Sequence, residues 1–359
     1  MTWLPDKVLS HLRAVVDLPD LSETPYRCIK RIGQGGMGTV YLAEDTRLHR
    51  NLALKILNQF GGENDLAQRM LQEAYIIAAL EHPGIVPIHD VGRLPDGRIF
   101  YTMKFVKGAR LDVQVKQPSS LPEVLRVFQK ACEAVAFAHA HKVVHRDLKP
   151  DNIMVGDFGE VLVMDWGLSK VLSAEHQLHS STTPTNIMRQ NLPKRMLPIP
   201  TSSQNLTQHG TVMGTPPYMA PEQQRGDITA IDERTDIYAL GAILSFLLAR
   251  STSTPSSSQT FAAKEKGLPA LVKRTSYKLP RQLTAIIQKA TAEDKNDRYD
   301  NVPQLTADIE NYLNGFPVSA YKENLLETVW RRLKQNKFLV FLILVYVLVR
   351  LFIFFLRQL

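Results

Sequence analysis

The segment His145-Arg-Asp-Leu-Lys-Pro-Asp-Asn152 is the most informative part of this sequence when it is taken with four motifs around it. Asp165-Trp-Gly167 and Ala220-Pro-Glu222 follow it, while Gly33-Gln-Gly-Gly-Met-Gly-Thr-Val40 and Leu52-Ala-Leu-Lys55 precede it. Each motif alone is weak evidence, because its residues could equally serve the core or the surface. It is very improbable that all five motifs occur in this order on one chain by chance.

The glycine-rich segment 33–40 is compatible with phosphate binding. Strand-like residues follow it at 39–44, whereas a dinucleotide-binding fingerprint would open a helix. It also lacks the Gly-Lys-Ser/Thr ending of a Walker A loop. A hairpin whose backbone amides approach phosphates is one interpretation, and an ordinary loose hairpin is the other.

Lys55 lies in an otherwise apolar stretch that predicts a strand. A lysine buried in a strand needs an anionic partner. Residues 66–80 have the pattern of a helix, and Glu73 on that helix can supply the partner.

At this point the sequence resembles the eukaryotic-like (Hanks-type) protein kinases, over roughly residues 26–316. The stretch 214–223, Gly-Thr-Pro-Pro-Tyr-Met-Ala-Pro-Glu-Gln, is most similar to bacterial membrane-anchored serine/threonine kinases. The resemblance implies an α+β, bilobal protein kinase fold with a small β-rich N-lobe and a larger helical C-lobe. It also implies an ATP-dependent phosphotransferase that acts in signalling on Ser and Thr hydroxyls of proteins, its own included.

The resemblance implies a role for each polar residue of the motifs. Phosphoryl transfer needs alignment and charge neutralisation more than covalent chemistry. Lys55, held by Glu73, would bind the α- and β-phosphates of ATP. Asp147 would accept the proton of the substrate hydroxyl, and Lys149 would stabilise the transferring phosphate as a point charge.

The resemblance assigns Asn152 and Asp165 to Mg²⁺, or to Mn²⁺ as its substitute, through hard oxygen ligands. A literal Asp-Phe-Gly stands at 157–159, whereas Asp165 is followed by Trp166, which could change the balance between active and inactive packing. Residues 153–164 predict a hairpin whose outgoing strand carries Asp157 roughly 10 Å or more from Asn152. The returning strand brings Asp165 back, so we predict Asp165 as the ligand and Asp157 as a solvated turn residue.

For the nucleotide, the resemblance implies an apolar slot around the adenine. Met103 would be its gatekeeper, and Phe105 and Val106 would supply backbone hydrogen bonds. The residues assigned to the nucleotide are Ile32, Gly33, Gly35, Gly36, Gly38, Val40, Ala53, Lys55, Met103, Phe105, Val106 and Met154.

Residues 173–210 lose periodicity and fill with Ser, Thr, Gln, Asn and Pro, which predicts a long insertion in the activation segment. It is either a solvated insertion or a loop that autophosphorylation orders. We expect phosphate there or near Thr211 and Thr215.

Two structural roles are predicted outside the catalytic set. Asp236, on a helix apolar enough to be buried, would anchor the backbone of the catalytic loop, and Glu222 would form an ion pair with Arg298 that braces the C-lobe.

The close spacing of His139, His141 and His145 suggests a metal cluster, but no Cys or carboxylate completes a zinc set.

The chain has 359 residues and a formal net charge of +8, and residues 1–25 form an extension without an export signal. Residues 338–356 are apolar except for Arg350, which predicts a transmembrane helix rather than a buried core helix. Cations in the segment 317–337 precede it, so the positive-inside rule places the kinase domain in the cytoplasm. The sequence thus predicts a single-pass, C-terminal anchor in the cell membrane, with the lipid bilayer as a partner.

Two other classes of protein compete with an active kinase. A pseudokinase would signal by binding, but such proteins usually lose residues of the Lys55, Asp147 or Asp165 type, which are all present. A nucleic-acid binder is supported only by the pI near 9.3, without an aromatic-basic strip or a recognition motif. We therefore expect protein substrates, a homodimer for trans-autophosphorylation, and no nucleic acid.

Overall fold

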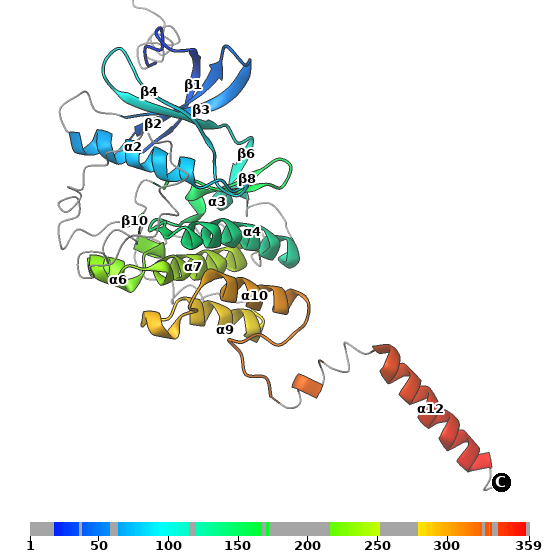
Figure 1. Ribbon diagram of the computed structural model, residues 1–359. Helices are drawn as coiled ribbons and strands as arrows, with labels where there is room; N and C mark the ends of the chain where they lie inside the picture. The colour runs from blue at the N-terminus through cyan, green and yellow to red at the C-terminus, as the bar shows by residue number, and fades with distance from the viewer. Residues whose placement is uncertain are drawn as a thin grey trace, which may run out of the picture.

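The computed structural model describes residues 18–35, 38–57, 64–114, 120–166, 170–171, 216–251, 279–324, 327–329, 331 and 337–356. Figure 1 shows a small lobe built on a sheet, a larger lobe built of helices, and a separate helix beyond the second lobe. The two-lobe arrangement is the one that the sequence predicts.

The N-lobe is an antiparallel sheet in the strand order β1-β2-β3-β5-β4. Its strands are β1 (Tyr26–Gln34), β2 (Gly38–Asp45), β3 (Arg50–Leu57), β4 (Ile88–Arg93) and β5 (Ile99–Lys104). The central strands β3 and β5 are almost wholly buried, as their apolar runs predict. Helix α2 (Asn64–Ala79) packs beside β4 and β5 (Figure 1) and confirms the helix predicted over 66–80.

The C-lobe is built on α4 (Leu121–Ala140), α7 (Glu233–Ser251), α9 (Arg281–Ala290) and α10 (Val302–Leu313). A capping box starts α4: Ser120 Oγ accepts from the Glu123 N–H, and Glu123 Oε2 accepts from the Ser120 N–H. Helix α7 is apolar on all sides and lies in the middle of the lobe between α4 and α9. It confirms the buried helix predicted from Asp236 onward.

Short elements connect the lobes and carry the catalytic loop. Strands β6 (Gly108–Arg110), β8 (Ile153–Gly156) and β9 (Val161–Val163) form one small sheet, and β7 (Val143–Val144) pairs with β10 (Lys170–Val171). Helix α3 (Leu111–Gln114) and a 3₁₀ turn at Pro150–Asn152 complete this layer, while α6 (Pro221–Gln224) lies in the C-lobe. The hairpin of β8 and β9 is the one predicted for residues 153–164.

The apolar core of the C-lobe is contiguous and is shared by α4, α7, α9 and α10. It reaches Trp166 at the end facing the N-lobe and Val318 beyond α10. Leu162 on β9 belongs instead to an N-lobe cluster with Ala53 and Met103. The β8–β9 hairpin therefore packs against both lobes, which fixes its position at the boundary.

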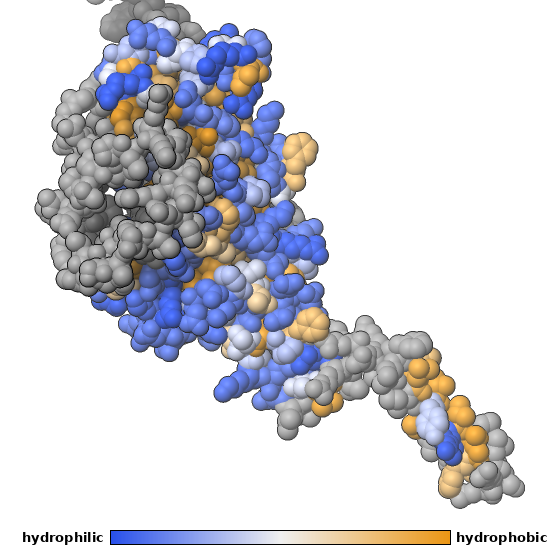
Figure 2. Space-filling model, viewed as in Figure 1, coloured by the Kyte–Doolittle hydropathy of each residue, from blue (hydrophilic) through white to orange (hydrophobic). Residues whose placement is uncertain are grey.

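The predicted transmembrane helix over 338–356 is wrong by the structure. Helix α12 (Lys337–Leu356) forms there, and Figure 2 shows hydrophobic residues on its surface. A spanning helix needs about 20 consecutive apolar residues. Arg350 interrupts the apolar stretch of α12, and its Nε donates to the Tyr346 hydroxyl at 3.0 Å. Within the described part of the chain, no helix is both long and apolar enough to cross a membrane.

Candidate active site

A cleft of about 450 Å³ lies between the lobes and falls within the size range of small-molecule sites. Both lobes contribute side chains to it. The lining residues are Gln34, Gly35, Gly38, Val40, Lys55, Ile77, Val86, Tyr101, Met103, Asp147, Lys149, Asn152, Met164 and Asp165. Most of the predicted polar site residues therefore meet in one cavity.

Lys55 lies between two carboxylates on the N-lobe side of the cleft. Its Nζ donates to Glu73 Oε1 at 2.8 Å, to Glu73 Oε2 at 3.1 Å and to Asp165 Oδ1 at 3.2 Å. Burial works against the charged amine, but the neighbouring Tyr101, Glu73 and Asp165 outweigh it and raise the pKa of Lys55. The amine is therefore a fixed cation next to Asp165.

The strand register explains a partner that the sequence analysis missed. Val40 on β2 pairs with Lys55 on β3, which in turn pairs with Tyr101 on β5. Directly paired residues of antiparallel strands point to the same face, so these side chains share the cleft side of the sheet. The Tyr101 hydroxyl donates to Glu73 Oε1 at 2.8 Å and helps to hold the carboxylate that holds Lys55. In the sequence, this role is indicated by a tyrosine within an otherwise apolar strand.

The catalytic loop gathers three of the predicted residues on the opposite side. Lys149 Nζ donates to Asp147 Oδ2 at 2.7 Å. Asn152 Nδ2 donates to the Asp147 carbonyl at 2.9 Å and to Asp147 Oδ2 at 3.3 Å. Because the nitrogen of Asn152 faces Asp147, its amide oxygen is the atom left to bind a cation.

Asp236 on α7 anchors the backbone of the catalytic loop, as predicted. Its carboxylate accepts from the His145 N–H at 2.8 Å and from the Arg146 N–H at 2.9 Å. His139 is one of the three histidines whose spacing suggested a metal cluster. Its Nε2 lies 2.8 Å from the Asp236 carboxylate. Burial would raise the pKa of Asp236, but these contacts lower it. Gln223, which the sequence analysis missed, donates to the Arg146 carbonyl at 2.7 Å.

The β8–β9 hairpin confirms the predicted path from Asn152 to Asp165. The Met164 N–H donates to the Asn152 carbonyl at 2.8 Å, which brings Asp165 beside Asn152. Asp165 adopts φ 60°, a conformation that non-glycine residues rarely take outside turns and functional sites. Lys55 and other cations lower the pKa of its carboxyl group against the opposing effect of burial. Asp157, the literal match to the family pattern, lies instead at the tip of the hairpin.

Some of the residues predicted for the nucleotide line the cleft and others do not. Val40, Ala53, Met103, Val106 and Met154 pack in one apolar cluster. Gly35 and Gly38 line the cleft, and a Cβ on Gly38 would lie 2.5 Å from the Ile56 carbonyl oxygen, so only glycine fits there. The predicted nucleotide residues that the structure describes but that do not line the cleft are Ile32, Gly33, Ala53, Phe105, Val106 and Met154.

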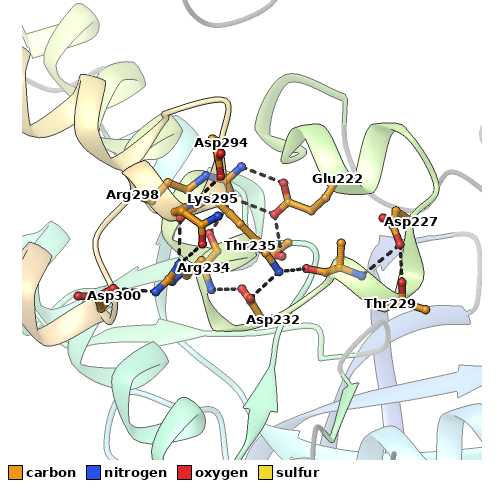
Figure 3. A network of polar contacts seen from close by, with 12 residues as sticks. Glu222, Asp227, Thr229, Asp232, Arg234, Thr235, Asp294, Lys295, Arg298 and Asp300 are labelled. Atoms are coloured by element: carbon orange, nitrogen blue, oxygen red, sulfur yellow. Dashed lines mark hydrogen bonds and ion pairs between the residues drawn. The ribbon is translucent and has the colours of Figure 1, made fainter.

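A polar network behind the site braces the C-lobe (Figure 3). The Arg298 guanidinium donates from both terminal nitrogens to the Glu222 carboxylate, each at 2.8 Å, and Thr235 Oγ1 donates to the same carboxylate at 2.9 Å. Arg298 and Glu222 are both buried, so the ion pair predicted from the sequence is a bidentate internal one. Exposed pairs such as Arg234 with Asp300 surround it.

The residues present fit ATP with a divalent metal. Phosphates need a cation, which the Lys55 amine supplies, and Mg²⁺ prefers oxygen ligands, which the Asp165 carboxylate and Asn152 amide offer. The purine needs an apolar slot, and Val40 and Met103 of the apolar cluster line the cleft.

Residues 26–308 match the family model of the protein kinase domain. The chain belongs to this family. It is 35% identical over 311 residues to the serine/threonine-protein kinase PknD of Protochlamydia amoebophila, a match that covers 81% of this chain and 30% of the relative. It is 37% identical over 316 residues to PknD of Chlamydia caviae, covering 81% and 31% of the two chains.

PknD of Chlamydia trachomatis serovar D is 34% identical over 322 residues, covering 84% of this chain and 33% of the relative. The family model confirms the predicted protein kinase family, and the matched relatives are serine/threonine-protein kinases. The chain spans about a third of the length of the curated relatives that it matches. Gly36, Thr211, Thr215 and the predicted insertion 173–210 lie outside the described residues.

Proposed function

We propose that this chain is a protein serine/threonine kinase that transfers the γ-phosphoryl group of ATP to Ser and Thr hydroxyls of proteins. The observation that carries the proposal is the Lys55 amine held between Glu73 and Asp165, in one cleft with the Asp147 carboxylate. The polar set that phosphoryl transfer requires is complete and hydrogen-bonded.

ATP bound with a divalent metal supplies the phosphoryl group that is transferred. The Asp147 carboxylate accepts the proton of the attacking hydroxyl. Lys149, whose amine lies 2.7 Å from that carboxylate, neutralises charge on the transferring group. Lys55 positions the phosphates, and Asn152 and Asp165 hold Mg²⁺, or Mn²⁺ in its place.

We further propose that one copy of the chain phosphorylates another. The support is the composition of residues 173–210, which are rich in Ser and Thr and follow the site directly in sequence. A transient homodimer would present this stretch, or Thr211 and Thr215, to the cleft of the second copy.

The test is transfer of radiolabelled phosphate from ATP to the chain and to a generic protein substrate, with Mg²⁺ or Mn²⁺. Lys55→Met and Asp147→Ala should each abolish transfer while circular dichroism shows an intact fold. Lys104→Met removes an exposed lysine at the end of β5 and is the matched control, which should retain activity. Near-normal transfer by the Lys55 or Asp147 variant would overturn the proposal.

A mixing experiment tests the second copy. The Asp147→Ala chain, distinguished by a size tag, should acquire label only when the active chain is present. Label that stays on the active chain at all concentrations, with first-order kinetics, would contradict transfer between copies.

A further inference from the structure

The chain beyond α10 docks on the C-lobe through residues 317–321, which we call the docking turn. Val318 is 3% exposed and belongs to the C-lobe core, while Ala320 and Tyr321 pack against that core from outside. The Tyr321 N–H donates to the Val318 carbonyl at 3.2 Å and closes the turn. A short turn with one buried and two partly buried side chains therefore attaches the following segment to the domain.

A buried carboxylate on α10 receives the docking turn. Asp308 is 2% exposed, and its carboxylate accepts from the Ser319 N–H at 2.6 Å, Ser319 Oγ at 2.9 Å and the Ala320 N–H at 3.0 Å. The Tyr299 hydroxyl supplies a fourth hydrogen bond at 2.8 Å. The docking turn thus provides most of the donors that compensate this buried charge.

Ser319 combines two properties that rarely coincide. The residue is exposed and lies in a turn, so a modifying enzyme can reach it. Its hydroxyl nevertheless donates to the buried Asp308 carboxylate. A phosphate on this oxygen would abolish the donated hydrogen bond and place about two negative charges next to a carboxylate.

The surrounding groups do not hold the turn against that change. Lys289 Nζ lies 3.4 Å from Ser319 Oγ and 4.3 Å from the centre of the Tyr299 ring, but it is one cation against a phosphate of about two negative charges and the Asp308 carboxylate. The next ion pair along the chain, Arg281 with Glu327 at 3.2 Å, is too exposed to contribute much.

We propose that Ser319 is a phosphorylation site and that its modification releases the docking turn from the C-lobe. The inference rests on the proposed function for its donor, which is ATP bound to a second copy of the chain. Ser319 Oγ forms the new bond to the γ-phosphorus, the bond from that phosphorus to the bridging oxygen of ADP breaks, and the hydroxyl proton passes to Asp147 of that copy.

The first experiment installs phosphoserine at position 319 of the full chain by genetic encoding and follows amide hydrogen exchange. Amides of the docking turn should exchange at least about tenfold faster than in the unmodified chain. Ser319→Ala loses the same hydrogen bond without adding charge, so its effect should be smaller. Asp308→Asn removes the repelling charge, and phosphoserine should accelerate exchange less in that background.

Unchanged exchange with phosphoserine, or slower exchange as capture by Lys289 would produce, would overturn the proposal. An equal effect of phosphoserine in the Asp308→Asn background would also overturn it, because the release would then not depend on this carboxylate. Ser319→Glu gives the same comparison if the encoded protein does not fold.

The second experiment maps phosphosites after incubation of the chain with ATP and Mg²⁺. Phosphate should appear on Ser319 and be absent when the Asp147→Ala chain is incubated alone. Labelling elsewhere but never on Ser319 would contradict modification by the chain itself. If no residue is labelled, the proposed function fails, while the encoded phosphoserine still decides whether modification releases the turn.

Discussion

Two triplets of Asp, an aromatic residue and Gly follow one another closely in this chain, and the β8–β9 hairpin sends them to opposite environments. Phe158 of the first triplet is 96% exposed at the hairpin tip, and Trp166 of the second is 0% exposed. The Trp166 ring packs on the His145 ring with 4.5 Å between centroids. Asp165 reaches Lys55 at 3.2 Å, while Asp157 contacts the Lys107 carbonyl through its backbone N–H.

The buried aromatic residue, and not the match to a sequence pattern, distinguishes the triplet whose aspartate lines the cleft. Trp166 is buried in the C-lobe core and therefore positions the preceding Asp165 against the cleft. Phe158 is almost fully exposed in the part of the chain that the structure describes, so the turn around it should tolerate change. Changes at the two triplets should accordingly differ in size.

Replacing the two aspartates should give the largest difference. Asp165→Ala should lower the rate of phosphoryl transfer by at least about 100-fold, because a charged group at the reacting phosphates is lost. Asp157→Ala should leave the rate within about threefold, since the residue is an exposed turn position. Initial rates with radiolabelled ATP measure both, and the reverse order would reassign the site.

Truncating the two aromatic residues should separate them next. Trp166→Ala should destabilise the fold by about 3–5 kcal/mol, as expected for a buried aromatic side chain. Phe158→Ala should change the free energy of unfolding by less than about 0.5 kcal/mol. Urea midpoints at a constant slope measure the difference, and equal midpoints for the two variants would contradict it.

A milder change sharpens the comparison within the buried triplet. The indole N–H of Trp166 is buried and has no hydrogen-bond partner among the residues that the structure describes. Trp166→Phe removes this unsatisfied donor but leaves a cavity, and these opposing effects should keep the change in unfolding free energy below about 1.5 kcal/mol. Urea unfolding beside Trp166→Ala tests this, and a loss as large as that of the alanine variant would refute it.

The smallest expected effect concerns pH. Because the pKa of Asp165 is lowered in the folded chain, its ion pair with Lys55 contributes stability above the unfolded-state pKa of about 3.9. That contribution should disappear as pH falls through the lower, folded-state pKa. The Asp165 side chain is 50% exposed, so solvent screening should keep the contribution below about 1 kcal/mol. The melting temperatures of wild type and Asp165→Asn should differ at pH 7, begin to approach each other below about pH 3.9, and converge once the pH is below the folded-state pKa. If the two melting temperatures differ by the same amount at every pH, the ion pair does not contribute to stability.

Much of the fold followed from local patterns. The helical pattern of residues 66–80 predicted α2, and a polar, glycine-bounded turn between two strand-like stretches predicted the β8–β9 hairpin. The assignment of Asp165 over Asp157 to the site depended on that hairpin alone. The roles of the predicted site residues in nucleotide and metal binding stay predictions, as does the location at a membrane.

Other features depended on packing and were missed. Tyr101 reaches Glu73 because β5 lies beside β3 and α2 covers the sheet, an arrangement that no short stretch of sequence contains. Gln223 reaches the catalytic loop from α6 for the same reason. At the C-terminus the apolar pattern alone predicted a membrane span, which the described residues of α12 do not support.

The residues that could do chemistry were recognisable in the sequence, because motifs and short strand and helix patterns are encoded within a few neighbouring positions. Which of these residues meet depends on how the whole chain packs. Asp236 binds the backbone at His145, and Asp308 binds Ser319, through contacts between segments that local propensity cannot relate. Such contacts arise because buried charges must find donors wherever packing places them, and packing is a property of the whole chain.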